Sequence, residues 1–117
     1  MRVISPKVIT EAMTAHAQWK VGLKLWLDVF DCGALPFESF SFIRDLWAST
    51  SGWNVDRIPA RKLRKESRKG PLDIYIFDVH KNDCRVVVWG SPKAHTFFVK
   101  GVYSHAEYDK WWKDQVK

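Results

Sequence analysis

The 117-residue sequence contains no run of about 18 apolar residues, the length that a membrane-spanning helix needs. Its opening stretch, residues 1–13, also lacks the apolar core of a secretory signal. The two cysteines, Cys32 and Cys84, do not make a disulfide framework, and no CxxC or HxxxH spacing indicates a zinc site. A glycine-rich phosphate loop and a GxSxG motif are missing as well. We therefore expect a cytoplasmic protein without a membrane contact, a bound metal or a cofactor.

Aromatic side chains are plentiful, with seven Trp, seven Phe and three Tyr. Such residues bury large apolar areas, so a chain of this length can build a core without disulfides. Hydrophobic residues make up 46% of the sequence and charged residues 27%, which is typical of a globular domain. We predict a single domain that spans residues 1–117.

Positive charge is in excess and lies in one half of the chain. Lys and Arg number 19 against 13 Asp and Glu, for a net charge of +6. Residues 1–55 hold five basic and five acidic side chains, so residues 56–117 carry the whole excess. The first half is predicted to be scaffold, and the second half to present a surface to an anionic partner such as nucleic acid.

The first half of the chain has helical periodicity. Ser5-Pro6 is typical of a helix start, with Ser5 as N-cap and Pro6 in the first turn. Apolar residues then recur at helical spacing as far as Cys32-Gly33, with one break expected near residues 15–18. A second helix is expected to open at Pro36 and to close at residues 49–52.

The second half changes to a period of two. Strands are predicted at residues 74–79, 85–89 and 96–103, and residues 1–4 are a further candidate. Short turns at residues 81–83 and 90–93 would join the three consecutive strands. Consecutive strands with short links predict an antiparallel meander.

A capping box marks the start of a last helix, with Ser104 as N-cap and Glu107 three residues later. The predicted fold is α+β: N-terminal helices packed on a small antiparallel β-sheet, with a short C-terminal helix. Within it the helical part covers about residues 5–50, the sheet part about 55–103, and the last helix about 104–115.

Residues 61–69 combine six cations with one carboxylate, and Gly70-Pro71 follows, which indicates a loop. One interpretation is a solvated basic loop; the other, which we favour in this basic half, is contact with phosphates. The same role is expected of Arg57, which precedes this loop, and of His80-Lys81 in the predicted turn between two strands. The expected RNA-binding residues are Arg57, Arg61, Lys62, Arg64, Lys65, Arg68, Lys69, His80 and Lys81.

Three residues are candidates for chemistry. Arg85 lies in an apolar strand, where it needs either an ion-pair partner such as Asp78 or a bound phosphate. His105 and Tyr108 are three residues apart at a helix start and so share a face. The positive end of the helix dipole disfavours the imidazolium, which would leave His105 able to accept a proton. The alternative is structural, with His105 in the cap region and Tyr108 in the core.

Two segments of the second half together form a distinctive pattern: Asp78-Val79-x-x-Asn82-x-x-Arg85-Val86-Val87 and Ser104-His105-Ala106-Glu107-Tyr108-Asp109-Lys110. With the opening Met1-Arg2-Val3-Ile4-Ser5, they resemble the HigB-type toxins of the RelE superfamily. The resemblance covers roughly residues 1–20 and 72–112, and the HAEYDK ending is its most specific part.

The resemblance implies a RelE-like fold and a role as the toxin of a type II toxin–antitoxin system. Such toxins are metal-independent endoribonucleases that cleave mRNA, typically on the ribosome, and leave a 2′,3′-cyclic phosphate and a 5′-OH. Carried over to this sequence, Arg85 would stabilise phosphate charge, and His105 with Tyr108 would match the terminal motif. The implied partners are mRNA, the ribosome and a cognate antitoxin, a small DNA-binding protein.

The sequence departs from the family pattern at two places. Residues 51–72 are longer and more basic than expected, so no lysine there is assigned a catalytic role. At the strand turn, where a glycine pair is common, this chain has His80-Lys81, which makes His80 a second acid–base candidate. Two other functions stay open: a non-catalytic RNA- or ribosome-binding module with the same fold, and a domain that docks an acidic protein.

Overall fold

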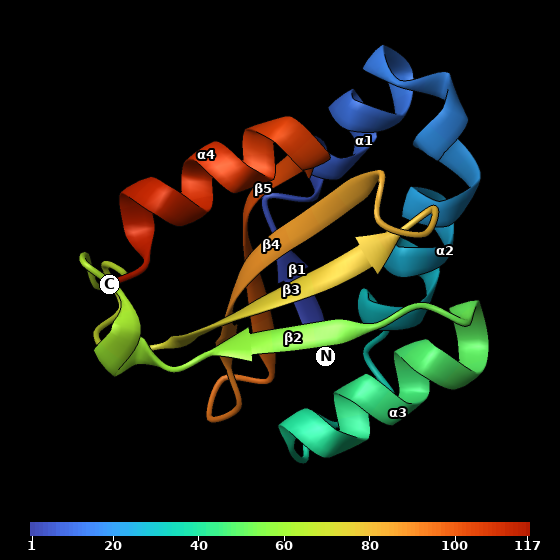
Figure 1. The fold of residues 1–117 in the computed structure, drawn as a ribbon. Coiled ribbons are helices and arrows are strands. Elements are labelled where there is room, and N and C mark those ends of the chain that lie inside the picture. Colours follow the sequence, from blue (N-terminus) through green and yellow to red (C-terminus); the bar gives the residue numbers. More distant parts are fainter.

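A five-stranded mixed sheet separates two helical layers in the computed structural model, which describes residues 1–117 (Figure 1). The strand order is β1-β5-β4-β3-β2, antiparallel throughout except that β1 runs parallel to β5. The strands are β1 (Arg2–Ile4), β2 (Val55–Ile58), β3 (Asp73–Val79), β4 (Cys84–Ser91) and β5 (Thr96–Ser104). The helices are α1 (Pro6–Ala15), α2 (Lys20–Phe30), α3 (Phe40–Ser51) and α4 (His105–Gln115), with 3-10 turns at Ala17–Trp19 and Ala60–Lys62. The α+β class is confirmed, but the sheet is not purely antiparallel as predicted.

The predicted long helix is broken where expected, between α1 and α2 around His16. Ser5 holds the N-cap position of α1, yet its backbone is left-handed (φ 64°) and its side chain makes no capping hydrogen bond. The α2 helix ends at Phe30 with Asp31 as C-cap, slightly before the predicted Gly33. Gly33 is therefore not the residue that stops the helix.

The second predicted helix starts later than Pro36. The N-cap of α3 is Ser39, whose side-chain oxygen accepts a hydrogen bond from the Phe42 N–H (3.1 Å). The residues before it are held in a non-helical path because Phe37 is buried (3% exposed) and its N–H donates to His95 Nδ1 (3.3 Å). At the other end Gly52 closes the helix with φ 83°, as the sequence indicated.

Two further boundaries differ from the sequence prediction. The short strand β2 was not predicted; it pairs with β3 at the edge of the sheet, and its burial pattern is not the alternation of a typical strand. The β4 strand continues through Gly90 to Ser91, so the turn to β5 lies at residues 92–95 instead of 90–93. Gly90 stays in the strand and packs against Tyr75 and Phe37.

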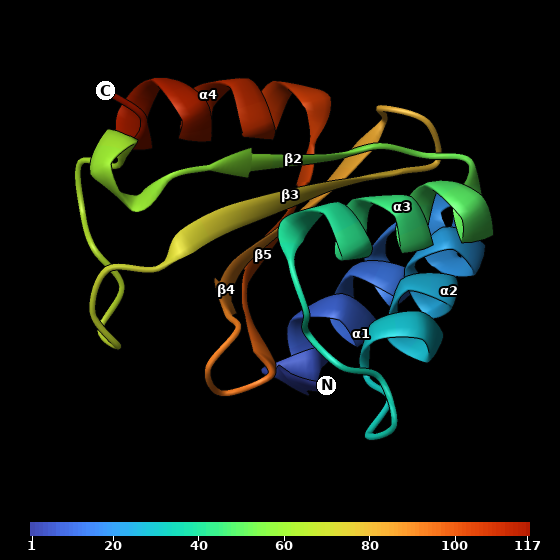
Figure 2. The ribbon, with the colours of Figure 1, turned by 90° about the horizontal axis from the view of Figure 1, so that it is seen from below.

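The two faces of the sheet carry separate cores. Helices α1, α2 and α3 cover one face, and α4 lies on the other (Figures 1 and 2). The first core is rich in aromatics, with Trp26, Phe30 and Phe97 fully buried against one another. A smaller cluster of seven buried residues lies under α4 and includes Trp111 and Val87. The first core fixes the scaffold, while the thinner α4 side leaves part of the sheet open.

None of the helices has the length and apolar character needed to cross a membrane.

Candidate functional site

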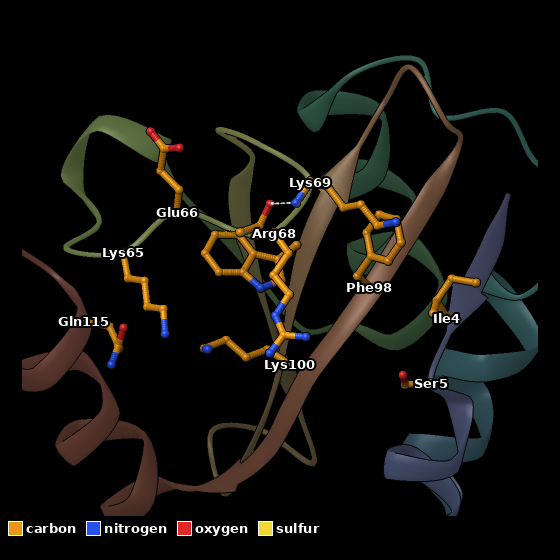
Figure 3. Close-up of a pocket in the computed structure, with 11 residues that line it drawn as sticks. Ile4, Ser5, Lys65, Glu66, Arg68, Lys69, Phe98, Lys100 and Gln115 are labelled. Carbon is orange, nitrogen blue, oxygen red and sulfur yellow. Dashed lines mark hydrogen bonds between the residues drawn. The ribbon is translucent and has the colours of Figure 1, made fainter.

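A cavity of about 510 Å³ opens on the α4 side of the sheet (Figure 3). Strands β4 and β5 form its floor, and the basic loop (residues 59–72) forms one wall. Gln115 of α4 lies at one end, and Ile4 and Ser5 at the start of the chain lie at the other. We call this the basic cavity. Its lining residues are Ile4, Ser5, Lys65, Glu66, Ser67, Arg68, Lys69, Trp89, Phe98, Lys100 and Gln115.

Backbone contacts hold the basic loop, residues 59–72, against the end of α4. Leu63 bridges to Val116, and the Arg64 N–H donates to the Gln115 carbonyl at 2.9 Å. Further along, a tight turn spans Ser67 to Gly70, and Gly70 adopts a left-handed φ of 97° that suits glycine. The loop is therefore tied to the fold at several points, and its cations are presented from a defined backbone.

Four cations line the basic cavity without an anionic partner. None of Lys65, Arg68, Lys69 and Lys100 has a carboxylate oxygen within 4.0 Å of its charged nitrogens. The one acidic residue of the lining, Glu66, points away from the amino groups of Lys65 and Lys100 (Figure 3). Partial burial and the charge of Lys65 together lower the pKa of Lys100. The cavity is therefore a site of uncompensated positive charge, suited to an anion.

A second group lies at the start of α4 and centres on Arg85. Its Nε is 3.0 Å from Asp78 Oδ1 on the neighbouring strand, and both side chains are largely buried. One Nη donates to the Asn82 carbonyl, and the guanidinium carbon lies 5.1 Å from the ring centre of Tyr108. The ion pair that the sequence left open as an alternative is thus present. Arg85 and Tyr108 are brought together as expected.

Tyr108 is held in its neutral form. The pKa of its hydroxyl is raised to about 12, chiefly by burial and also by nearby carboxylates, while Arg85 acts in the opposite direction. The phenol can therefore donate a hydrogen bond at neutral pH. It also lines a cavity of about 500 Å³ between β2 and α4, together with Asp56 and Trp112.

His105 begins α4 but does not contact the Arg85 pair. The capping box is confirmed: Ser104 accepts from the Glu107 N–H, and Glu107 accepts from the Ser104 N–H. The imidazole is solvent-exposed, and its Nε2 is 3.5 Å from Asp109 Oδ2 one turn along. The helix start therefore presents His105 to solvent, on the same helix as Tyr108.

The other predicted RNA-binding residues are spread over several surfaces. Arg57 faces α3, where it lies over the Phe40 ring (5.3 Å) and 3.9 Å from Asp73. At the β3–β4 turn, the exposed His80 has its Nδ1 3.0 Å from Asp83, and Lys81 adjoins it. Arg61, Lys62 and Arg64 are exposed on the loop but do not line the basic cavity, whereas Lys65, Arg68 and Lys69 do. The predicted set thus contributes one wall of the cavity.

Sequence reasoning missed the floor of the cavity, which consists of Trp89, Phe98 and Lys100. A signal for two of them was available, because the period of two places Phe98 and Lys100 on one face of a strand. Nothing in the sequence told which strand face would meet the basic loop. His80, Cys84, His95 and His105, the side chains considered for a metal, form no cluster of three or more.

These features define a small basic α+β protein with a cavity of unpaired cations beside its C-terminal helix. Residues 64–111 match the family model HigB_toxin, described as the RelE-like toxic component of a toxin-antitoxin system. The matched segment runs from the basic loop through β3, β4 and β5 into α4. The resemblance to HigB-type toxins is confirmed over this segment, which makes up less than half of the chain, and the match supports a toxin role. None of the curated proteins matches the chain.

Proposed function

We propose that the protein is a metal-independent endoribonuclease that cleaves mRNA on the translating ribosome in the cytoplasm, and so inhibits translation and growth. The observation that carries this proposal is the basic cavity, whose four cations have no carboxylate partner. A polyanion that releases counterions on binding is the ligand such a surface favours. The match of residues 64–111 to a toxin family supports the same conclusion.

The cleavage step uses the substrate's own nucleophile. The 2′-OH gives its proton to a base and attacks the adjacent phosphorus, and the bond from phosphorus to the 5′-oxygen breaks. The leaving 5′-oxygen takes up a proton, which gives a 2′,3′-cyclic phosphate and a 5′-OH. General acid–base catalysis contributes about 10²–10⁴ to such a rate, and charge stabilisation a comparable factor.

Arg85, His105 and Tyr108 are the proposed catalytic residues. Arg85 is oriented by its ion pair with Asp78 and by the hydrogen bond from one Nη to the Asn82 carbonyl, so its second Nη can donate to a phosphate oxygen. The neutral Tyr108 hydroxyl can donate a hydrogen bond beside it. His105, solvent-exposed at the start of α4, is the proton carrier in this proposal.

Expression of variants tests the assignment. The wild-type protein should arrest growth within minutes, whereas Arg85→Ala and His105→Ala should remove most toxicity while far-UV circular dichroism stays unchanged. Arg44→Ala is the matched control, because this exposed arginine of α3 contacts only its own helix, where it pairs with Asp45 and lies over the Phe40 ring. The cleaved RNA should carry a 5′-OH, and EDTA should not slow the reaction. Full toxicity of both variants, or loss of cleavage on chelation, would contradict this mechanism.

A non-catalytic RNA- or ribosome-binding module is the second candidate. It is favoured by two observations: Asp78 neutralises Arg85, and His105 pairs with Asp109 instead of lying against Arg85. Such a module would bind RNA or ribosomes and inhibit translation without producing cleaved ends. Mapping of RNA ends after expression separates the two functions.

The partner proposed for the toxin is a small DNA-binding antitoxin. An acidic or groove-filling segment that covers the basic half would block RNA, because it would satisfy the same unpaired cations. Purification of the protein from its native host should recover a small acidic partner in a tight complex, and addition of RNA should not displace it. Recovery of the chain alone from growing cells would contradict this proposal.

A further inference from the structure

We propose that the basic cavity binds an unpaired nucleotide of single-stranded RNA, with its base against Trp89 or Phe98 and its phosphate on Lys100. The proposal rests on the proposed function in one respect, that RNA is the substrate. It goes further by assigning a binding site, separate from Arg85, that selects unpaired RNA over duplex RNA.

The cavity offers aromatic faces as well as charge. Trp89 and Phe98 are only partly buried, so each ring presents apolar surface to the cavity. The Lys100 Nζ lies 5.6 Å from the Trp89 ring, and the Lys69 Nζ lies 5.8 Å from the Phe98 ring. A cation over an exposed ring contributes only about 0.5–1 kcal/mol. A base that stacks on one of these rings would displace the lysine ammonium from the ring face. The ammonium can then contact the phosphate of the same nucleotide.

Lys100 lies on the cavity floor at a β-bulge. In the register between β4 and β5, Val88 pairs with Val99 and Val87 with Gly101, so Lys100 is the extra residue. Bulges of this kind are frequent near active sites. Lys100 follows Phe98 by two residues along β5, so both side chains lie on the α4 side of the sheet, where both line the cavity.

Repulsion within the cavity also favours a bound phosphate. The charge of Lys65 acts on Lys100 and destabilises its ammonium. No carboxylate relieves this repulsion in the free protein. An anion between the two amino groups would convert it into attraction, as opposite charges a few ångströms apart stabilise each other.

The size and place of the cavity suit one nucleotide near the proposed catalytic group. Its volume of about 510 Å³ lies within the range of small-molecule sites. Trp89 and Arg85 lie four residues apart on β4, which at about 3.3 Å per residue puts them roughly 13 Å apart. Alternation along the strand places both on the α4 face. An RNA strand that follows β4 can therefore reach both sites.

Stacking on a protein ring requires a base that has left its duplex partners. Duplex RNA would present its phosphates to the same cations but could not reach the rings of Trp89 and Phe98. The aromatic floor should therefore distinguish the two forms, whereas the cations alone would bind both.

Binding of a short 2′-O-methyl RNA, which cannot be cleaved, tests the site. Trp89→Leu should weaken binding of the single strand by about 5- to 150-fold, the range that base stacking gives, and should leave binding of the matching duplex nearly unchanged. Trp89→Phe should restore most of the affinity. Trp112→Leu is the matched control, because Trp112 is an exposed aromatic (42%) that does not line the cavity.

Salt dependence reports the phosphate contact separately. Lys100→Gln should reduce the slope of log affinity against log salt by about 0.7, the value for one phosphate of a single strand. Trp89→Leu should leave that slope unchanged. Lys20→Gln, on the exposed side of α2, should change neither affinity nor slope.

Crosslinking of the wild-type protein avoids any effect of substitution on folding. An oligonucleotide with a photoreactive uridine should crosslink to Trp89 or Phe98, and an adenosine monophosphate competitor should reduce that crosslink far less than unlabelled single-stranded RNA. Crosslinks elsewhere, or equal loss of single-strand and duplex affinity in Trp89→Leu, would overturn the site. If Trp89→Leu binds and cleaves RNA as the wild-type protein does, the nucleotide site is wrong but the proposed function stands. If RNA binding depends on Trp89 as expected but the wild-type protein never cleaves RNA, the proposed function is wrong but the site stands.

Discussion

At the scale of single residues, the Arg85–Asp78 pair carries the clearest electrostatic role. The two side chains are 13% and 21% exposed, and their atoms meet at 3.0 Å across adjacent strands. Arg85 also lies against the Tyr108 ring, so the pair joins the sheet to the start of α4. Removal of the carboxylate would leave a largely buried guanidinium without its counter-ion, which is costly.

Asp78→Asn should therefore lower the free energy of unfolding by about 1–3 kcal/mol, measured by urea denaturation at neutral pH. Asp83→Asn is the control, because its carboxylate pairs with His80 at an exposed turn and such pairs contribute little. Equal losses in the two variants would mean that burial of the pair does not matter.

At the scale of secondary-structure elements, α2 approaches the sheet at Gly22. A Cβ at this position would lie 2.6 Å from Val79 Cγ1 and 3.2 Å from the Trp53 ring. Val79 is fully buried in β3 and cannot move away freely. The glycine thus sets the spacing between the helix layer and the sheet that presents Arg85 and Trp89.

Gly22→Ala should destabilise the protein by about 1–3 kcal/mol, because overpacking outweighs the gain of about 1 kcal/mol in helix propensity. Gly33→Ala provides the comparison, since nothing lies within 4 Å of its Cβ position. Thermal unfolding of both variants checks this, and a stabilised Gly22→Ala would show that α2 can shift.

At the scale of the whole molecule, all three tyrosines are held neutral by the fold. Burial raises the pKa of Tyr75 and of Tyr108 to about 12 and also raises that of Tyr103. In an unfolded chain, tyrosine titrates near pH 10. Between about pH 10 and pH 12 the unfolded chain therefore releases protons that the folded protein retains.

Stability should accordingly fall as pH rises through this window, while below about pH 10 the tyrosines contribute no pH dependence. Denaturant midpoints across the alkaline range measure the fall, and tyrosinate absorbance of the folded protein should stay low until the protein unfolds. Tyr75→Phe should make the alkaline fall shallower. Tyrosinate absorbance that develops near pH 10 with the fold intact would contradict the raised pKa values.

Local patterns in the sequence were sufficient for several features of this protein. The period of 3.6 residues predicted the helical first half and its break, and the period of two predicted β3, β4 and β5. The reciprocal hydrogen bonds between Ser104 and Glu107 involve residues only three apart, so the capping box was visible directly. The HAEYDK segment likewise indicated the resemblance to HigB-type toxins, which the family match confirms over residues 64–111.

The candidate site was only half visible from the sequence. The basic loop was identified from its charge, but its partners on the floor, Trp89 and Phe98, lie far from it in the sequence. The Arg85–Asp78 pair was one of two alternatives until the register of β3 and β4 placed the two residues opposite each other. Arg57 was grouped with the loop by proximity in sequence, although the sheet turns it to the α3 side.

The sequence by itself thus determined the element types, the α+β class and the charged half, because each depends on residues a few positions apart. The tertiary structure decided the parallel pairing of β1 with β5, the addition of β2, and the gathering of Lys100 with the basic loop. Pairing and register depend on contacts between distant segments, and a single bulge at Lys100 changes which side chains share a face. Periodicity gives the two faces of a strand, but only packing selects the neighbour that each face meets.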